Sequence, residues 1–155
     1  MKISNVSIER IWKEMEDLPD FDKQLPLQGV EDQTDMSYGS GQVELLKNKE
    51  TDFIHPLYPE LKYINSIMSD MKMYRTRILK LHSFDCYSYH YDLSKRIHIP
   101  ITTNKKCMFI IDDIVYRFPA DGSVYLVDTT KFHTAINANR EDFIRIHIVG
   151  CVNES

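Results

Sequence analysis

Two segments in the first half of the chain carry apolar residues at helical spacing. The first follows Ser7, a residue type that caps helices well, and stops at Pro19. Its apolar positions recur at steps of three and four: Ile8, Ile11, Trp12, Met15 and Leu18. The second, 57–73, repeats this spacing with Leu61, Ile64, Ile67, Met68 and Met71. The pattern predicts two helices, separated over 21–49 by a loop with one short strand.

From residue 75 onward the chain has the pattern of a β protein. It is rich in Ile, Val, Tyr, Phe and Thr, and turn signals such as Asp112-Asp113 and Ala120-Asp121-Gly122 interrupt it at short intervals. The expected strands cover 75–82, 85–92, 95–102, 105–111, 114–118, 123–128, 132–137 and 143–151. So many short strands predict a mainly β fold, a double-stranded β-helix (cupin-like jelly roll), with the N-terminal helices packed on the sheet.

The composition fits one globular domain. The chain has 155 residues, of which 43% are hydrophobic and 27% are charged, enough for one ordinary core but not for two. We therefore expect a single domain over 1–155, with a helical and loop-rich part over 1–74 and a jelly-roll core over 75–151. The net charge of −4, without a long basic run, argues against nucleic acid as a partner.

The sequence carries no pattern of export or membrane insertion. Its first ten residues lack a continuous apolar segment, and runs of about 18 apolar residues do not occur. Cys86, Cys107 and Cys151 have no paired spacing, which is typical of reduced thiols that pack in a core. These features predict a cytoplasmic protein without a membrane partner.

The pattern with the most chemical content is His90-Tyr91-Asp92, followed 41 residues after Asp92 by His133. If 85–92 is a strand, residues i and i+2 point to the same side, so His90 and Asp92 can chelate one ion. Two imidazoles and one carboxylate can occupy one face of a metal ion and leave the opposite face open. A lone histidine in a strand more often has a structural role, and that alternative stays open for these residues.

Two further strands each place an arginine and a histidine on one face. Polar and apolar residues alternate in Arg96-Ile97-His98-Ile99 and in Arg145-Ile146-His147-Ile148. A buried arginine is costly unless an anion or a carboxylate pairs with it. A barrel interior that holds a metal and an anionic ligand would supply such a partner. The alternative for Arg145 is an ion pair with a nearby acidic residue: Glu141, Asp142 or Asp128.

Together these motifs resemble the aspartyl/asparaginyl β-hydroxylase family of Fe(II)- and 2-oxoglutarate-dependent dioxygenases, including small bacterial members such as proline cis-4-hydroxylases. The resemblance covers about half of the chain. The matching segments are Arg77-Ile78-Leu79-Lys80-Leu81, His90-Tyr91-Asp92, Arg96-Ile97-His98-Ile99-Pro100, Gly122, His133-Thr134-Ala135-Ile136-Asn137 and Arg145-Ile146-His147-Ile148. Some vertebrate members lack the carboxylate ligand, which Asp92 provides here.

The resemblance implies a role for each site residue. The implied iron ligands are His90, Asp92 and His133. Arg145 corresponds to the residue that binds the far carboxylate of 2-oxoglutarate, for which a bidentate guanidinium is well suited. Arg96 and His98 correspond to a pair near the metal-bound end of this cosubstrate. Beyond the metal site, the resemblance implies no catalytic residue.

The implied activity is hydroxylation of a C–H bond in an amino acid or aminoacyl residue by dioxygen, with decarboxylation of 2-oxoglutarate to succinate. Two alternatives stay open. One is a cupin metalloenzyme of another reaction class, with Zn²⁺ or Mn²⁺ in the same ligands. The other is a non-catalytic module that binds 2-oxoglutarate or an amino acid. The short chain favours a small-molecule substrate, and a homo-oligomer that closes the site is compatible with it.

Overall fold

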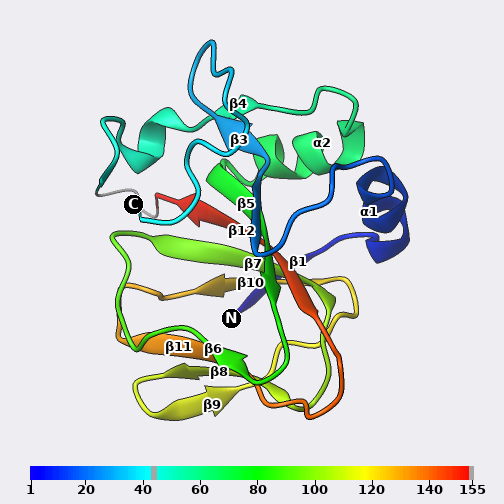
Figure 1. Ribbon diagram of the computed structural model, residues 1–155, viewed down its shortest axis with the longest axis vertical. Helices are drawn as coiled ribbons and strands as arrows, with labels where there is room; N and C mark the ends of the chain where they lie inside the picture. Colours follow the sequence, from blue (N-terminus) through cyan, green and yellow to red (C-terminus); the bar gives the residue numbers. More distant parts are fainter. Residues whose placement is uncertain (43–44, 154–155) are drawn as a thin grey trace.

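The computed structural model describes residues 1–42 and 45–153, and this part of the protein is mainly β, with two short α-helices and three antiparallel sheets (Figure 1). The helical elements are α1 (Ile8–Met15), α2 (Lys62–Asp70) and the 3-10 helix η2 (Glu50–Asp52). The strands are β1 (Lys2–Asn5), β2 (Gln24–Pro26), β3 (Gln28–Gly29), β4 (His55–Pro56), β5 (Tyr74–Leu81), β6 (Asp85–Cys86), β7 (Lys95–Thr102), β8 (Cys107–Ile111), β9 (Ile114–Tyr116), β10 (Ser123–Val127), β11 (His133–Asn137) and β12 (Arg145–Val152). The predicted mainly β class is confirmed.

A six-stranded sheet forms the centre of the molecule, in the order β1-β10-β7-β12-β5-β2. A four-stranded sheet, β6-β11-β8-β9, lies below it in Figure 1, and β3 pairs with β4 near the top. The long strands β7 and β12 pair so that Val149 lies opposite His98 and Cys151 opposite Arg96. In the described part of the chain, no strand joins the two larger sheets edge to edge, and they do not close into a barrel.

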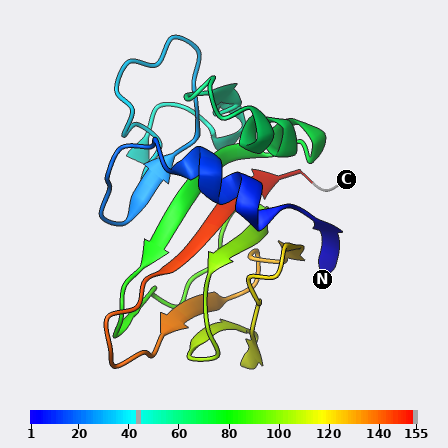
Figure 2. The ribbon, with the colours of Figure 1, turned by 90° about the vertical axis from the view of Figure 1, so that its right-hand side faces the viewer.

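The two α-helices cover one face of the six-stranded sheet (Figures 1 and 2). Ser7 caps α1 as predicted, since its side-chain oxygen accepts a hydrogen bond from Arg10 N at 3.2 Å. α2 occupies only the central part of the predicted segment 57–73. One buried cluster joins the helices to the sheet, and it includes Ile11, Ile64, Ile67, Met68, Ile78, Ile97, Ile99 and Ile148. The predicted packing of the N-terminal helices on the sheet is therefore confirmed.

Most of the expected strands form with ends shifted by at most two residues, but the strand expected over 85–92 is wrong. Only Asp85–Cys86 is strand there, followed by an isolated bridge between His90 and His133. The N–H of Tyr87 donates to Ala135 O, whereas that of Asp92 donates to Thr129 O. Tyr87 and Asp92 are five positions apart in the sequence, whereas Ala135 and Thr129 are six apart, so the regular ladder is interrupted.

Two short strands form the edges of the large sheet, and only β2 falls in a segment, 21–49, where the sequence predicted a short strand. β1 pairs with β10, and β2 pairs with β5. β1 has only four residues and is mostly exposed, so it lacks the alternation that predicts a strand. β2 ends at Pro26, which lacks an N–H and is tolerated at a sheet edge. Tertiary pairing, rather than local propensity, forms both strands.

A second core lies between the two larger sheets. Its buried members are Leu81, Phe109, Val127 and Ala135. Leu81 and Val127 come from the six-stranded sheet, and Phe109 and Ala135 come from the four-stranded sheet. The apolar contacts fill only part of the space between the sheets. The remaining part is lined by polar and charged side chains and forms the cavity described below.

Gly122 has a backbone conformation that other residues rarely adopt, with φ of +90°, and a Cβ built there lies 2.6 Å from Val6 O. We expect Gly122→Ala to lower the free energy of unfolding by about 1–3 kcal/mol, measured by urea denaturation. Gly41→Ala is the matched control, because Gly41 has φ of +73° and no atom of the described residues within 4 Å of its Cβ position. Equal losses in both variants would show that the contact with Val6 contributes nothing.

Candidate metal centre

Backbone pairing brings His90 and His133 together. His133 is the first residue of β11, and the N–H of each histidine donates to the carbonyl of the other, at 3.1 Å and 2.8 Å. Their ring centroids lie 4.5 Å apart. Asp92 is fixed beside them because its N–H donates to Thr129 O at 2.8 Å. The three side chains predicted as metal ligands therefore converge, although His90 and Asp92 do not share a regular strand.

The hydrogen bonds of the two imidazoles determine which nitrogen faces Asp92. His90 Nδ1 lies 2.6 Å from Ser88 O, and His133 Nδ1 lies 2.8 Å from Lys131 O. Carbonyl oxygens only accept hydrogen bonds, so both Nδ1 atoms carry the proton. His90 Nε2 lies 3.5 Å from Asp92 Oδ1, and His133 Nε2 lies 3.5 Å from Asp92 Oδ2. In the neutral rings, two lone pairs point toward a carboxylate.

Such an arrangement of acceptors is stabilised by a cation between them. One ligand atom from each of the three residues lies within 4.8 Å of the other two, a spacing that could hold a metal ion. Burial lowers the pKa of His133, which favours the neutral, metal-binding ring over the protonated one. Backbone carbonyls that hold Nδ1 also orient metal-binding histidines in general. The donor set of two nitrogens and one carboxylate therefore fits a divalent transition metal.

The three ligands lie at one side of a cavity of about 530 Å³ between the two larger sheets. Phe109 lines it from β8 and stacks on the His133 ring, with centroids 5.5 Å apart. The inward faces of β5, β7 and β12 supply the opposite wall. Four arginines line the cavity: Arg75, Arg77, Arg96 and Arg145. All four are buried, so the cavity is strongly cationic on the side of the large sheet.

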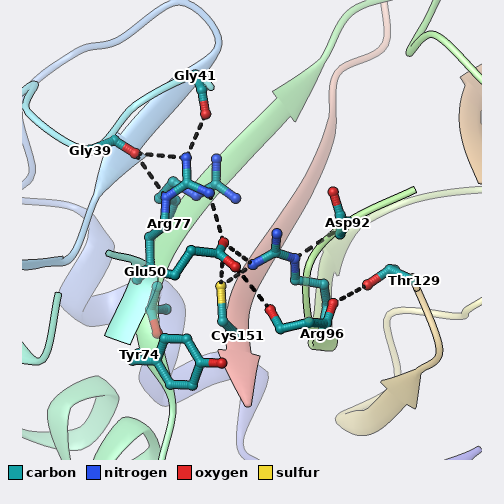
Figure 3. Close-up of polar contacts among 12 residues, drawn as sticks. Gly39, Gly41, Glu50, Tyr74, Arg77, Asp92, Arg96, Thr129 and Cys151 are labelled. Atoms are coloured by element: carbon teal, nitrogen blue, oxygen red, sulfur yellow. Dashed lines mark hydrogen bonds and ion pairs between the residues drawn. The ribbon is translucent and has the colours of Figure 1, made fainter. Parts of the chain in front are cut away.

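Arg96 is held by acidic residues inside the cavity (Figure 3). Its guanidinium donates to Glu50 Oε2 at 2.9 Å and to Asp92 Oδ2 at 3.2 Å, and it contacts Cys151 Sγ. The pKa of Arg96 is raised, because Cys151, Asp92 and Glu50 outweigh the effect of its burial. Arg96 therefore orients Asp92, in addition to lining the cavity as the sequence predicted.

Glu50 joins Arg96 to a second buried arginine. Its Oε2 accepts from Arg75 at 3.1 Å, and Arg75 also donates to the carbonyls of Gly39 and Gly41. Burial alone would raise the pKa of Glu50, but Arg96 and Arg75 lower it below its ordinary value. Arg75 has φ of +48°, a conformation that arginine rarely adopts. The cluster therefore holds a strained backbone position at the start of β5.

Arg145 also lies in the cavity, but without a protein partner among the described residues. Only 3% of its surface is exposed, its Nε lacks a hydrogen bond, and it forms no ion pair in the described part of the chain. The alternative pairing with Glu141, Asp142 or Asp128 is absent there. Burial lowers the pKa of Arg145. A buried guanidinium without an anion is suited to bind an anionic ligand.

His98 lines the cavity as predicted, and its Nδ1 lies 3.2 Å from His147 Nδ1. Burial, followed by the charge of Arg145, lowers the pKa of both rings well below the usual range. Both rings are therefore neutral at neutral pH. Within the described part of the chain, His147 Nε2 has no hydrogen-bond partner. His98 also contacts the edge of Phe109, with centroids 5.2 Å apart, so it is fixed by both sheets.

Four residues that shape this cavity were not predicted as site residues from the sequence: Gln24, Glu50, Arg75 and Arg77. For Arg75 and Arg77 a signal was present, since the two arginines stand two positions apart in a predicted strand, as Arg96 and His98 do. The sequence contained no such signal for Gln24 and Glu50, which reach the cavity from a three-residue edge strand and a 3-10 helix of the N-terminal part.

The comparisons with known proteins assign no family. No protein-family model matches the chain, and no curated protein matches it. One solved structure with partial similarity is the plu4264 protein from Photorhabdus luminescens, with 20% sequence identity and a TM-score of 0.38. The match covers 48% of this chain and 59% of that one, so the chain spans less than two thirds of that protein. None of the helices in residues 1–42 and 45–153 has the length and apolar character needed to cross a bilayer.

Proposed function

We propose that the protein is an Fe(II)- and 2-oxoglutarate-dependent dioxygenase that hydroxylates a C–H bond of an amino acid or aminoacyl residue. The observation that supports this most is the convergence of His90 Nε2, His133 Nε2 and the Asp92 carboxylate beside a cavity with an unpaired, buried Arg145. This combination provides three metal ligands on one side and a cationic group for a dicarboxylate on the other.

The finer fold assignment belongs to the same proposal. Two antiparallel sheets face each other, and the candidate ligands point into the space between them. This arrangement is typical of a double-stranded β-helix, in which a metal centre lies inside the barrel. We therefore propose a cupin-like jelly roll and a relationship to the aspartyl/asparaginyl β-hydroxylase family, supported by the motifs between Arg77 and Val149.

Five residues of the cavity have defined roles in this proposal. The metal is held by His90, Asp92 and His133. Arg145 binds the far carboxylate of 2-oxoglutarate, and Arg96 keeps Asp92 in position through its 3.2 Å contact. When bound, Fe(II) and 2-oxoglutarate supply the oxidising chemistry that protein side chains lack. The two sheets exclude water and hold the substrate beside the metal. Partners are thus a small-molecule substrate and dioxygen.

Turnover of 2-oxoglutarate tests this proposal. The protein, reconstituted anaerobically with Fe(II), is mixed with oxygenated buffer, 2-oxoglutarate and a panel of amino acids, and succinate is measured. We expect succinate above the no-protein background. Arg145→Gln should raise the KM for 2-oxoglutarate about 10- to 100-fold, because it removes hydrogen bonds to a charged group. Arg140→Gln is the control, since Arg140 is exposed and does not line the cavity.

Three results would contradict the proposal. Absence of succinate together with absence of 2-oxoglutarate binding would exclude an oxygenase of this class. Activity with Zn²⁺ or Mn²⁺ that is unaffected by Arg145→Gln would instead favour a cupin metalloenzyme of another reaction class. Binding of 2-oxoglutarate without turnover of any substrate in the panel would favour a non-catalytic binding module.

A further inference from the structure

The four arginines of the cavity differ in how their charges are compensated. Arg96 and Arg75 share Glu50, and Arg96 also pairs with Asp92. Arg77 and Arg145 have no acidic partner in the described part of the chain, although each is less than a tenth exposed. Two buried guanidiniums thus face the cavity without an anion.

The charges in the cavity leave room for two anionic ligands. Four guanidiniums face two carboxylates, those of Glu50 and Asp92, which leaves two positive charges among the described lining residues. The two positive charges of a divalent metal and the two negative charges of 2-oxoglutarate would cancel. The excess of two positive charges would therefore persist in the loaded site, and buried uncompensated charge is costly. A second anionic group beside the uncompensated guanidinium, such as the carboxylate of a substrate, would lower this cost.

Arg77 is held in place but not neutralised. Its Nη1 donates to Gln24 Oε1 at 3.0 Å, and the same oxygen accepts from Gly41 N at 3.1 Å. Arg77 Nε has no hydrogen-bond partner among the described residues. Burial, with the neighbouring charges of Arg75 and Arg96, lowers the pKa of Arg77 to about 10. The side chain is thus still a cation at neutral pH. Figure 3 shows Arg77 beside the Glu50 cluster.

Arg77 and Arg145 lie at different positions along the sheet. Arg77 is opposite Val149, whereas Arg145, on the same strand as Val149, is opposite Leu81. The two backbone positions are thus four residues apart along the strand, roughly 13 Å at the rise of a β-strand. Both side chains line the same cavity as the metal ligands. This separation suits two different anions better than one.

We propose that Arg77, positioned by Gln24, binds a carboxylate of the substrate. The proposal rests on the oxygenase function above, in which Arg145 is assigned to 2-oxoglutarate. It narrows the substrate to a small carboxylic acid, such as a free amino acid, and argues against an internal residue of a peptide. Arg77 is then a residue that determines specificity, because a guanidinium in a low-dielectric site discriminates a carboxylate from its neutral amide.

The experiment compares wild type, Arg77→Gln, Arg145→Gln and the exposed control Arg140→Gln. Substrates are free L-amino acids, their carboxamides and short peptides that contain the same residues internally. We expect Arg77→Gln to raise the KM of the preferred free acid about 10- to 100-fold and to abolish the preference for the acid over its amide. The affinity for 2-oxoglutarate, measured by anaerobic calorimetry, should stay that of wild type, while Arg145→Gln lowers it.

A stability measurement separates binding from a structural role. Without ligands, Arg77→Gln should be at least as stable in urea as wild type, because a buried charge without an acidic partner is removed. If wild type neither binds nor consumes 2-oxoglutarate, the oxygenase function fails, and direct calorimetric binding of the amino acids to the metal-loaded protein still tests Arg77. The assignment of Arg77 is overturned if wild type uses or binds the carboxamides as well as the acids. It is also overturned if Arg77→Gln leaves the affinity for the acid unchanged, or if it lowers the affinity for 2-oxoglutarate as Arg145→Gln does.

Discussion

Asp92→Ala is expected to weaken metal binding by more than about 100-fold and to abolish turnover. Loss of a residue that only hydrogen-bonds to a metal ligand already costs about 10- to 100-fold in metal affinity, and loss of a ligand should cost more. The variant keeps both imidazoles but removes the carboxylate that faces their Nε2 atoms at 3.5 Å. Two neutral nitrogens remain, too few ligands to hold a divalent ion against water. Calorimetric titration of Mn²⁺ into the metal-free protein measures the affinity without oxidation, and succinate formation measures turnover with Fe(II).

The control for this variant is Asp142→Ala, because Asp142 is exposed and does not line the cavity. Its metal affinity should equal that of wild type. Asp92→Ala also removes a partner of Arg96, so its unfolding by urea is measured in parallel. A folded Asp92→Ala protein that binds Mn²⁺ as tightly as wild type would refute the assignment of these three residues as ligands.

Glu50→Gln should lower the free energy of unfolding by about 3–5 kcal/mol at pH 7, the cost of removing one member of a buried ion pair. Glu50 is the acidic partner of Arg75 and one of two acidic partners of Arg96, so both buried cations lose compensation together. Urea denaturation gives the value. Glu60→Gln, at an exposed position, should leave the free energy of unfolding unchanged.

The same contribution depends on pH in a defined direction. The pKa of Glu50 in the folded protein lies below its ordinary value of 4.5. Its stabilising effect is therefore complete above that value and is lost as the pH falls through the folded pKa. The difference in stability between wild type and Glu50→Gln should shrink as the pH is lowered from 5 to 3. A difference that stays constant over this range would mean that the carboxylate charge is not what stabilises the fold.

Local pattern was sufficient for several of the residues that lie on long, regular strands. The alternation around Arg96 and Arg145 placed both side chains on inward faces, and the structure brings both into one cavity with His98. The cap at Ser7 and the turn at Asp112-Asp113, where both residues have positive φ, were also predictable. These features depend on neighbours in the sequence, so a single sequence contains them.

The remaining features depend on contacts between distant segments. Glu50 reaches Arg96 from a 3-10 helix, and no periodicity links residues so far apart in the chain. His90 and Asp92 lie outside a regular strand because their backbone bonds go to His133 and Thr129 at uneven spacing. The H-x-D spacing thus predicted correctly that His90 and Asp92 lie side by side, but the reason it gave, alternation on a regular strand, was wrong. Hydrogen bonds to Ser88 and Lys131, rather than strand alternation, aim the imidazoles.

The position of Asp92 between the sheets has a thermodynamic consequence. One of its oxygens lies 3.5 Å from His133 Nε2 on the four-stranded sheet and 3.2 Å from Arg96 Nε on the six-stranded sheet. Any change in the charge that Arg96 experiences therefore changes how strongly Asp92 attracts a metal. By reciprocity, a metal that alters the dissociation constant of an anion on the arginine wall has its own dissociation constant altered by the same factor. The two sheets would then act as one coupled binding unit, although no described strand joins them.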